Sequence, residues 1–264
     1  MVIEWRFAKG DETRLPELAT ELVRLKPEIL VTTGTQPART LRDATTTIPI
    51  VVVSAGDLVG RGIVASLARP GGNITGFTAI APELNGKRLE ILKEIVPHAL
   101  RVAFLHNPHE QDELRDLEIA ARALGLRVQP HEMDQASQFQ SAYAAMSRER
   151  TGALVISRNP FTNSHRKELI GLVAKYRLPA MCDGTEWTNA GCLISYAQDR
   201  REGSRRAALL IDKILKGAKP SDLPVEQPTK FELVINLKTA KQIGVTIPPS
   251  VLYRADKVIK DAPR

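Results

Sequence analysis

The stretch from Ile48 to Thr78 reads IPIVVVSAGDLVGRGIVASLARPGGNITGFT, and it sets the fold class. Its first residues, Ile48–Val53, form a continuous apolar run, which is typical of a parallel strand covered on both faces. Gly60–Leu67 is expected to be helical and to stop at Pro70-Gly71-Gly72. Asn73–Phe77 then predicts a second short strand. This order of strand, helix and strand indicates an α/β protein with parallel sheets.

The glycines in this stretch do not form a phosphate-binding loop. A P-loop or a dinucleotide fingerprint places its glycines after a strand and before a helix. Gly71-Gly72 lies in the reverse order, after the expected helix and before a strand, so we interpret it as a turn. Gly76 and Thr78 differ, because they lie at the end of a strand, where ligands bind. Gly76 can let a ligand approach the backbone, and Thr78 can donate a hydrogen bond.

The same alternation covers the rest of the chain. Further strands are predicted at Val2–Phe7, Glu28–Thr32, Arg101–His106, Arg127–Pro130, Ala153–Ser157, Pro179–Cys182, Cys192–Tyr196 and Phe231–Asn236. Further helices are predicted at Asp11–Leu25, Pro37–Ala44, Leu84–Val96, Asp112–Leu124, Gln138–Ser147, Asn163–Tyr176, Arg200–Leu215 and Leu237–Ile243. After Pro248-Pro249 we expect a polar tail. The number of strands and the break at Pro97 predict two α/β lobes, each a doubly wound parallel sheet.

Composition excludes several classes of protein. The 264 residues carry a net charge of +7, but the basic residues are dispersed among acidic ones, so a nucleic-acid partner is not expected. No apolar run approaches the length of a membrane-spanning helix. The first residues lack the features of a signal peptide, which predicts a cytoplasmic protein if this start is genuine.

Cys182 and Cys192 are the two cysteines of the chain, and their spacing matches no metal or redox motif. This favours two buried reduced thiols. A single disulfide, formed in an oxidising compartment, stays open as the alternative.

The residues that follow the predicted strands indicate a ligand site, because parallel sheets bind ligands at the carboxyl ends of their strands. These residues are polar, contain glycine and include a few aromatic rings. Such a set suits a small ligand with hydrogen-bonding groups and a flat or apolar part. Asp57, Asp183 and Asp199 can accept hydrogen bonds from an ammonium or hydroxyl group of a ligand. Each of them can equally be a helix N-cap.

Catalysis and metal binding have little support in the sequence. The five histidines show no spacing typical of metal ligands. No serine lies in a nucleophile-elbow motif, and no nucleophile–base pair stands out. We therefore expect no catalytic residue, no metal and no cofactor.

Three long segments carry a resemblance to a known family. They are Ile48–Thr78, Gly86–Pro108 (GKRLEILKEIVPHALRVAFLHNP) and Leu223–Ile259 (LPVEQPTKFELVINLKTAKQIGVTIPPSVLYRADKVI). In this order they resemble the ABC-transporter substrate-binding proteins related to the tryptophan- and phenylalanine-binding proteins of bacterial uptake systems. The similarity extends from Val2 essentially to the end of the chain.

The resemblance implies a periplasmic-binding-protein type I fold, in which two lobes close by a hinge around a ligand in the cleft between them. It places residues 1–97 and 191–224 in the first lobe and residues 98–190 and 225–264 in the second. The cleft positions of the first lobe match Thr35, Ser54, Asp57, Phe77 and Thr78. Those of the second lobe match Asn107, Asn159, Phe161 and Asp183. Tyr196 and Asp199 lie where the chain crosses back, and the phenylalanine and tyrosine rings can stack on a flat ligand.

The resemblance also has two departures. Family members usually begin with a signal peptide and one further strand and helix, so the chain is expected to be shortened at its N-terminus. The loop His106–Glu113 (HNPHEQDE) is more acidic and bulkier than the Asn-Pro-x-x-x-Ser loop of amino-acid-binding relatives, which weighs against an amino-acid ligand.

The function implied is solute binding for an ABC importer. The solute is a small organic molecule, with an aromatic amino acid or aromatic acid as the first expectation, and it is delivered to an ABC permease in the inner membrane. Family resemblance places such a protein in the periplasm. A cytosolic small-molecule sensor stays open as an alternative, and an α/β enzyme is the weaker one.

Overall fold

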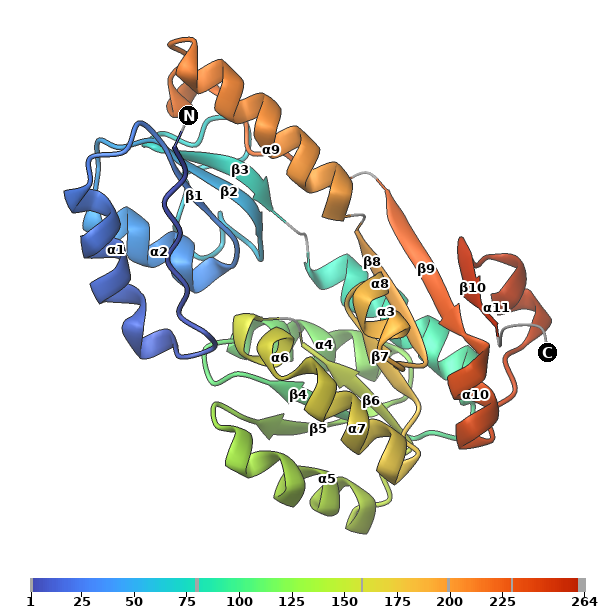
Figure 1. Ribbon diagram of the computed structural model, residues 1–264. Coiled ribbons are helices and arrows are strands. Elements are labelled where there is room, and N and C mark those ends of the chain that lie inside the picture. Colours follow the sequence, from blue (N-terminus) through green and yellow to red (C-terminus); the bar gives the residue numbers. More distant parts are fainter. Residues whose placement is uncertain (1, 79–80, 158, 199, 229, 261–264) are drawn as a thin grey trace. The chain divides into compact units, whose positions relative to one another are not determined.

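The computed structural model describes residues 2–78, 81–157, 159–198, 200–228 and 230–260. The chain divides into two compact units, whose elements are labelled in Figure 1. The first unit consists of Met1–Ile80 and Asp199–Lys230, and the second consists of Ala81–Gln198 and Phe231–Arg264. The chain therefore passes from one unit to the other three times.

The first unit is built on a three-stranded parallel sheet with the order β1-β2-β3. Its elements are η1 (Glu12–Arg14), α1 (Leu15–Arg24), β1 (Leu30–Thr32), α2 (Thr35–Ala44), β2 (Ile50–Ala55), β3 (Ile74–Thr78), α9 (Arg200–Leu215) and η3 (Pro220–Asp222). Side chains of the central strand alternate between two apolar clusters. Ile50 and Val52 pack with α1 and α2, whereas Val51 packs with α9. The apolar run is thus covered on both faces, as predicted, and Figure 1 shows α9 lying along β2 and β3.

The second unit is built on a seven-stranded sheet with the order β10-β9-β8-β7-β6-β4-β5. Its strands are β4 (Arg101–His106), β5 (Arg127–Glu132), β6 (Ala153–Ile156), β7 (Ala180–Cys182), β8 (Ile194–Gln198), β9 (Phe231–Asn236) and β10 (Lys257–Ile259). Its helices are α3 (Ala81–Ile95), α4 (Gln111–Ala123), η2 (Ala136–Gln138), α5 (Phe139–Arg148), α6 (Pro160–Ser164), α7 (Arg166–Tyr176), α8 (Thr185–Asn189), α10 (Leu237–Ile243) and α11 (Pro249–Tyr253). All neighbouring strands are parallel except the pair β8 and β9.

Each face of this sheet has its own apolar core. Residues of α3, α4, α10 and α11 pack on one face, around Phe104 and Ile235. Residues of α5, α6, α7 and α8 pack on the other face, around Phe139 and Trp187. The prediction of an α/β protein with doubly wound, mainly parallel sheets is confirmed.

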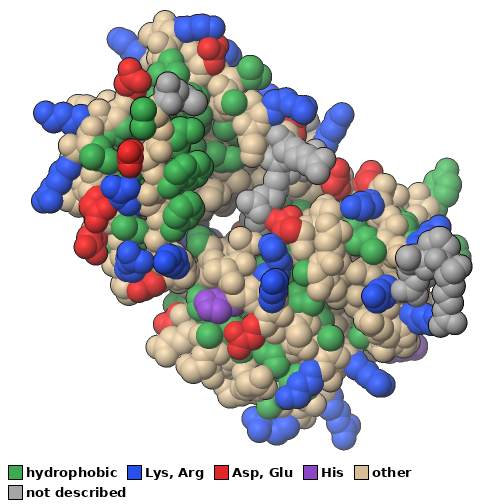
Figure 2. Space-filling model, in the orientation of Figure 1, with side chains coloured by type: hydrophobic (Ala, Val, Ile, Leu, Met, Phe, Trp, Pro, Cys, Tyr) green, Lys and Arg blue, Asp and Glu red, His purple; other side chains and the backbone are tan. Residues whose placement is uncertain are grey.

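Two predicted elements of the first unit are wrong. Val2–Phe7 is not a strand, because it pairs with no strand in the described part of the chain. Its side chains are mostly solvent-exposed, with Val2 86% and Trp5 65% exposed. Figure 2 shows hydrophobic side chains gathered where Figure 1 draws this segment. Gly60–Leu67 is a series of turns rather than a helix. Gly62 has a φ of +64°, and the Leu58 carbonyl accepts hydrogen bonds from two successive amides, those of Ile63 and Val64.

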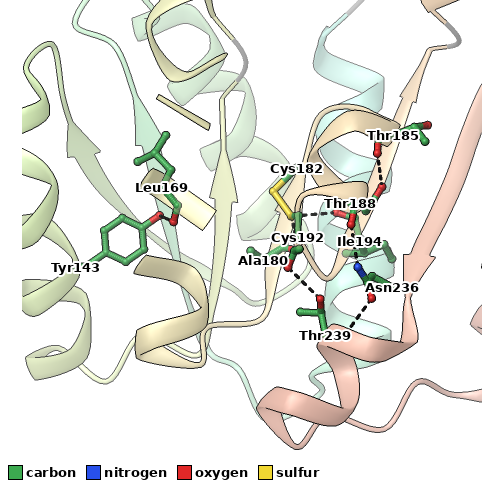
Figure 3. Close-up of a disulfide and its surroundings, with 11 residues drawn as sticks. Tyr143, Leu169, Ala180, Cys182, Thr185, Thr188, Cys192, Ile194, Asn236 and Thr239 are labelled. Carbon is green, nitrogen blue, oxygen red and sulfur yellow. Dashed lines mark hydrogen bonds between the residues drawn. A yellow bond between two sulfur atoms is a disulfide. The ribbon is translucent and has the colours of Figure 1, made fainter. Parts of the chain in front are cut away.

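Cys182 and Cys192 form a disulfide, so the expectation of two reduced thiols is wrong. Cys182 ends β7, and Cys192 lies just before β8, which is the parallel neighbour of β7. The connection through α8 therefore returns the chain to a Cα–Cα separation of 6.5 Å. Figure 3 shows the disulfide beside α8 and the start of α10.

The boundaries of the units differ from the predicted limits of the lobes. Helix α3 packs through Leu89 and Leu92 into the core of the second unit, although residues 1–97 were predicted to form the first lobe. Strand β8 also pairs within the second sheet. The end of the chain adds α11 and β10 where only a polar tail was predicted. Within the described residues, no helix has both the length and the apolar character needed to cross a membrane.

Candidate functional site

The carboxyl edge of the first sheet brings Thr35 and Thr78 together around Gly56, and Ser54 lies at the same edge. The Thr78 hydroxyl donates to the Gly56 carbonyl at 2.5 Å, and the Gly56 amide donates to Thr35 Oγ1 at 3.1 Å. Thr78 Oγ1 also accepts from the Leu58 amide at 3.3 Å. The Ser54 carbonyl accepts from the Gly34 amide at 2.7 Å. These hydrogen bonds join neutral groups and hold the loop that follows β2, the same loop that carries the carboxylate of Asp57.

Phe77 lies in the core of the first unit rather than at its surface. The ring is 3% exposed and packs with Ala207 and Leu210 of α9. The Arg206 guanidinium lies over it at 5.5 Å from the ring centroid, and Arg206 pairs in turn with Glu226. The predicted stacking of this ring on a ligand therefore has no support from its packing.

Gly76 serves a close approach between two strands. Its φ is +140°, and a Cβ at this position would lie 2.1 Å from the Val52 carbonyl oxygen in β2. The close approach that requires a glycine here is therefore that of the neighbouring strand β2.

Asp57 caps a turn. Its Oδ1 accepts hydrogen bonds from the Val59 amide at 3.0 Å and the Gly60 amide at 2.8 Å. Of its two predicted roles, the structure shows the capping role, at a turn instead of a helix.

In the second unit, the loop after β4 meets the loop after β6 through Glu110. The Asn107 amide donates to Glu110 Oε2 at 2.9 Å, and Asn159 Nδ2 donates to the same oxygen at 3.0 Å. Asn159 also caps α6, because its Oδ1 accepts from the Thr162 amide at 2.8 Å. The two predicted asparagines are thus joined by a carboxylate, and both side chains are buried.

Glu113 lies one turn further along α4 and contacts the end of β6. Its carboxyl group accepts a hydrogen bond from Ser157 Oγ at 2.6 Å. Burial of this carboxyl group, together with the negative charge of Glu110, raises the pKa of Glu113 to about 7. The Ser157 hydroxyl and the positive charge of Arg88 act in the opposite direction. Glu113 therefore titrates near neutral pH.

Arg88 of α3 joins the ends of β7 and β8. The side chain is 7% exposed. Its Nη2 lies 3.0 Å from Asp183 Oδ2, and its Nε donates to the Tyr196 carbonyl at 2.9 Å. Its Nη1 donates to Asn85 Oδ1 at 3.3 Å. Asp183, predicted as a ligand acceptor or a cap, is therefore the partner of a buried arginine.

We refer to these charged groups and the serine that accompanies them as the strand-end cluster. It consists of Arg88, Glu110, Glu113, Ser157 and Asp183. Its residues come from two helices and from the segments after β4, β6 and β7. Arg88 and Asp183 also influence the pKa of Glu113 electrostatically, so the members lie within reach of one another.

The disulfide fixes one side of the strand-end cluster, because Asp183 directly follows Cys182. Asn236 Nδ2 donates to the Thr188 carbonyl at 2.8 Å, and Thr239 Oγ1 donates to the Gly191 carbonyl at 3.0 Å. These bonds, visible in Figure 3, hold the segment between β7 and β8 to the start of α10. The segment between β7 and β8, which begins with Asp183, is therefore held by the disulfide and by these two hydrogen bonds.

The remaining predicted residues have different places. Phe161 is buried in the second core, against Phe139 and His165. The Tyr196 ring is partly buried, and its centroid lies 5.7 Å from the centroid of the Phe231 ring. Asp199 lies outside the described residues.

Sequence reasoning did not select Arg88, Glu110, Glu113 or Ser157 as site residues. The acidic loop His106–Glu113 was the available signal for the two glutamates, and Ser157 directly follows a predicted strand. Arg88 lies within a helix far along the chain from Asp183 and Tyr196, so only the fold reveals their contact.

The arrangement offers hydrogen-bond donors, acceptors and charge, as a binding site for a small polar ligand requires. Within the described ranges, no group of three or more histidine, cysteine, aspartate or glutamate residues is placed to hold a metal ion.

Comparison with known proteins gives a match over nearly the whole chain. The model of the family described as ABC transporter substrate binding protein matches residues 1–259. A tyrosine-binding protein of Clostridioides difficile (strain R20291) is 24% identical over 252 residues, which are 92% of this chain and 70% of that protein.

Two solved structures share the fold. One is the ABC domain from Streptococcus pneumoniae in complex with L-Trp, with 25% identity and a TM-score of 0.91 over 98% of this chain and 90% of that one. The other is a conserved domain protein from Vibrio cholerae O1 biovar El Tor, with 28% identity and a TM-score of 0.90 over 97% and 86% of the two chains. These similarities confirm the predicted periplasmic-binding-protein type I fold.

Proposed function

Because the chain belongs to the family of ABC transporter substrate-binding proteins, we propose that it captures a small organic solute and delivers it to an ABC permease. The observation that carries the proposal is the strand-end cluster. In this cluster, buried polar and charged side chains gather at the carboxyl ends of the strands, where parallel sheets bind ligands. Such side chains give orientation and specificity to a bound ligand. Family membership favours binding without catalysis over the enzyme alternative.

The proposed solute has an aromatic part. A tyrosine-binding protein and a structure in complex with L-Trp are among the similar proteins. An aromatic amino acid or an aromatic acid is therefore the first class of ligand to test. Thr35, Ser54 and Thr78 of the first unit and Asn107, Asn159, Asp183 and Tyr196 of the second remain the proposed ligand-binding residues.

The proposed place of action is outside the cytoplasm. Disulfides form and persist in oxidising compartments such as the bacterial periplasm and are rare in the cytosol. The Cys182–Cys192 disulfide and the family both favour an extracytoplasmic protein over a cytosolic sensor.

A thermal-shift screen of the purified protein tests the proposal. The panel contains L-tryptophan, L-tyrosine, L-phenylalanine, tryptamine and 4-hydroxybenzoate, with L-alanine and glucose as non-aromatic controls. Ligand at 100 times its Kd stabilises the folded protein by about 2.7 kcal/mol, which gives a clear rise in Tm. Stabilisation by at least one aromatic compound and by neither control is expected. A cooperative melt that no aromatic compound shifts would contradict the aromatic solute.

A further inference from the structure

The three carboxylates of the strand-end cluster differ in the groups that stabilise their negative charge. Glu110 accepts from the Asn107 amide and from Asn159 Nδ2. Asp183 pairs with Arg88 at 3.0 Å. The described residues give Glu113 one hydrogen-bond partner, the neutral hydroxyl of Ser157. Glu113 is therefore the least compensated carboxylate of the cluster.

Arg88 does not neutralise Glu113 by direct contact. Its three nitrogen atoms are engaged by Asp183, the Tyr196 carbonyl and Asn85 Oδ1. Its charge is thus already balanced by Asp183, and it reaches Glu113 only as a more distant positive charge. A cation that contacted Glu113 would meet a negative environment to which Glu110 and Asp183 also contribute.

A second observation points to a ligand. Asn85 is 0% exposed, and its Nδ2 has no hydrogen-bond partner among the described residues, although its Oδ1 accepts from Arg88 within the same group of side chains. A buried amide donor without a partner costs free energy unless another molecule supplies an acceptor. A ligand oxygen would satisfy it.

We propose that Glu113 is a specificity-determining residue of this site and that it binds the ammonium group of an organic amine. The inference rests on the proposed function, since it names the class of solute that the same site takes. It differs from that proposal in requiring a positive charge on the ligand and no carboxylate. Where the amine also carries a hydroxyl or carbonyl oxygen, that oxygen would accept from Asn85 Nδ2; tryptamine has none and tests the contact with Glu113 alone.

The proposal has a consequence for pH. The charged groups that act on Glu113 are Glu110 near the start of α4, Arg88 on α3 and Asp183 after β7. A bound ammonium group would lower the raised pKa of Glu113, so amine binding would release a proton near pH 7. Affinity for an amine should therefore rise about tenfold from pH 6 to pH 8, while an aliphatic ammonium group stays protonated.

Isothermal titration with matched compounds tests the proposal. The indole series is tryptamine, L-tryptophan and indole-3-propionate, and the phenol series is tyramine, L-tyrosine and 3-(4-hydroxyphenyl)propionate. We expect each amine to bind at least tenfold more tightly than the corresponding acid at pH 8. At pH 7, where about half of Glu113 is protonated, the heat of amine binding should vary with the ionisation enthalpy of the buffer, in the sense of proton release.

Two variants separate the role of Glu113 from a general effect of charge. Glu113→Gln keeps the size of the side chain and its contact with Ser157, and it should lose about tenfold in amine affinity together with the pH dependence. Glu118→Gln removes a charge from the same helix, α4, and should leave both unchanged. Thermal melts of both variants establish that they are folded.

The outcomes distinguish a failure of the amine inference from a failure of the proposed function. An acid that binds as tightly as its amine, or amine affinity that Glu113→Gln leaves unchanged, overturns the role of Glu113 but leaves an aromatic solute standing. Absence of binding by all six compounds to the folded protein overturns the aromatic solute and the amine inference together.

Discussion

Polar side chains lie at the carboxyl edge of each of the two sheets, but those of the first sheet are held by neutral hydrogen bonds and those of the second include charged groups. In the first unit, Thr78 and Thr35 hold Gly56 through neutral hydrogen bonds of 2.5 and 3.1 Å, respectively. In the second unit, Glu113, Asp183 and Arg88 place charges at the strand ends. Neutral hydrogen bonds that satisfy one another shape a surface, whereas buried charges depend on what neutralises them.

The two edges should therefore respond to different variables. A neutral edge should be sensitive to packing and to lost hydrogen bonds, and insensitive to pH. A charged edge whose carboxyl group has a raised pKa should be sensitive to pH and to the charge of a ligand. Three substitutions test this contrast in the absence of ligand.

The largest effect is expected for Phe77→Ala, which removes the ring that supports the neutral edge beside Thr78. Because Phe77 is buried between β3 and α9, its truncation should lower the free energy of unfolding by about 3–5 kcal/mol. Urea unfolding measures the change. Phe7→Ala, at a ring that is 63% exposed, is the matched control and should change stability by less than about 0.5 kcal/mol. A Phe77→Ala protein as stable as the control would show that the ring is not part of the core.

Glu113→Gln should have an intermediate effect that depends on pH. The folded-state pKa of Glu113 is raised to about 7, so the folded protein binds the proton more tightly than the unfolded chain. Stability from this group is present below the unfolded pKa and is lost as pH rises through the folded pKa. At pH 8 the variant should therefore be more stable than the wild type, by on the order of 1–3 kcal/mol.

Unfolding free energies at pH 5 and pH 8 check this sign. The advantage of Glu113→Gln should shrink or vanish at pH 5. An advantage of equal size at both pH values would mean that Glu113 does not titrate in this range, and the charged edge would then lose its predicted sensitivity to pH.

The smallest effect is expected for Thr78→Val at the neutral edge. The substitution keeps the shape of the side chain but leaves the Leu58 amide without the hydroxyl acceptor. We expect a loss of about 1–2 kcal/mol that is the same at pH 5 and pH 8. Thr20→Val, at an exposed hydroxyl bonded to the Pro16 carbonyl, is the control. A strong pH dependence of the Thr78→Val effect would remove the contrast between the two edges.

Local sequence patterns were sufficient where an element's own side chains determine it. The predicted ranges Arg101–His106, Arg200–Leu215 and Phe231–Asn236 coincide with β4, α9 and β9. Val2–Phe7 has the apolar content of a strand, but a strand also needs a neighbour to pair with, and no local pattern reports one. Gly60–Leu67 has apolar residues at helical spacing, yet its first amide donates to Asp57 in a turn and Gly62 takes a left-handed conformation.

The candidate site was predictable in position but not in its chemistry. The rule that ligands bind at strand ends indicated polar loops such as the one after β4, and part of the strand-end cluster lies there. It did not reveal that Asp183 is bound by Arg88 or that Asn107 and Asn159 share Glu110. Such partners lie far apart in the sequence, and their pKa values and charges depend on that contact. The disulfide was missed for the same reason, because the spacing of two cysteines does not show that β7 and β8 are neighbours.

The antiparallel pairing of β8 with β9 has a consequence for the order in which the chain can fold. Gln198 lies opposite Phe231, so the edge of β8 has no partner until residues beyond 230 have been synthesised. Strand β10 then adds outside β9. During synthesis, the sheet of the second unit is therefore left with an open edge that can pair with other chains. A polypeptide that ends before Phe231 would keep this edge permanently, and it should aggregate where the full-length chain does not.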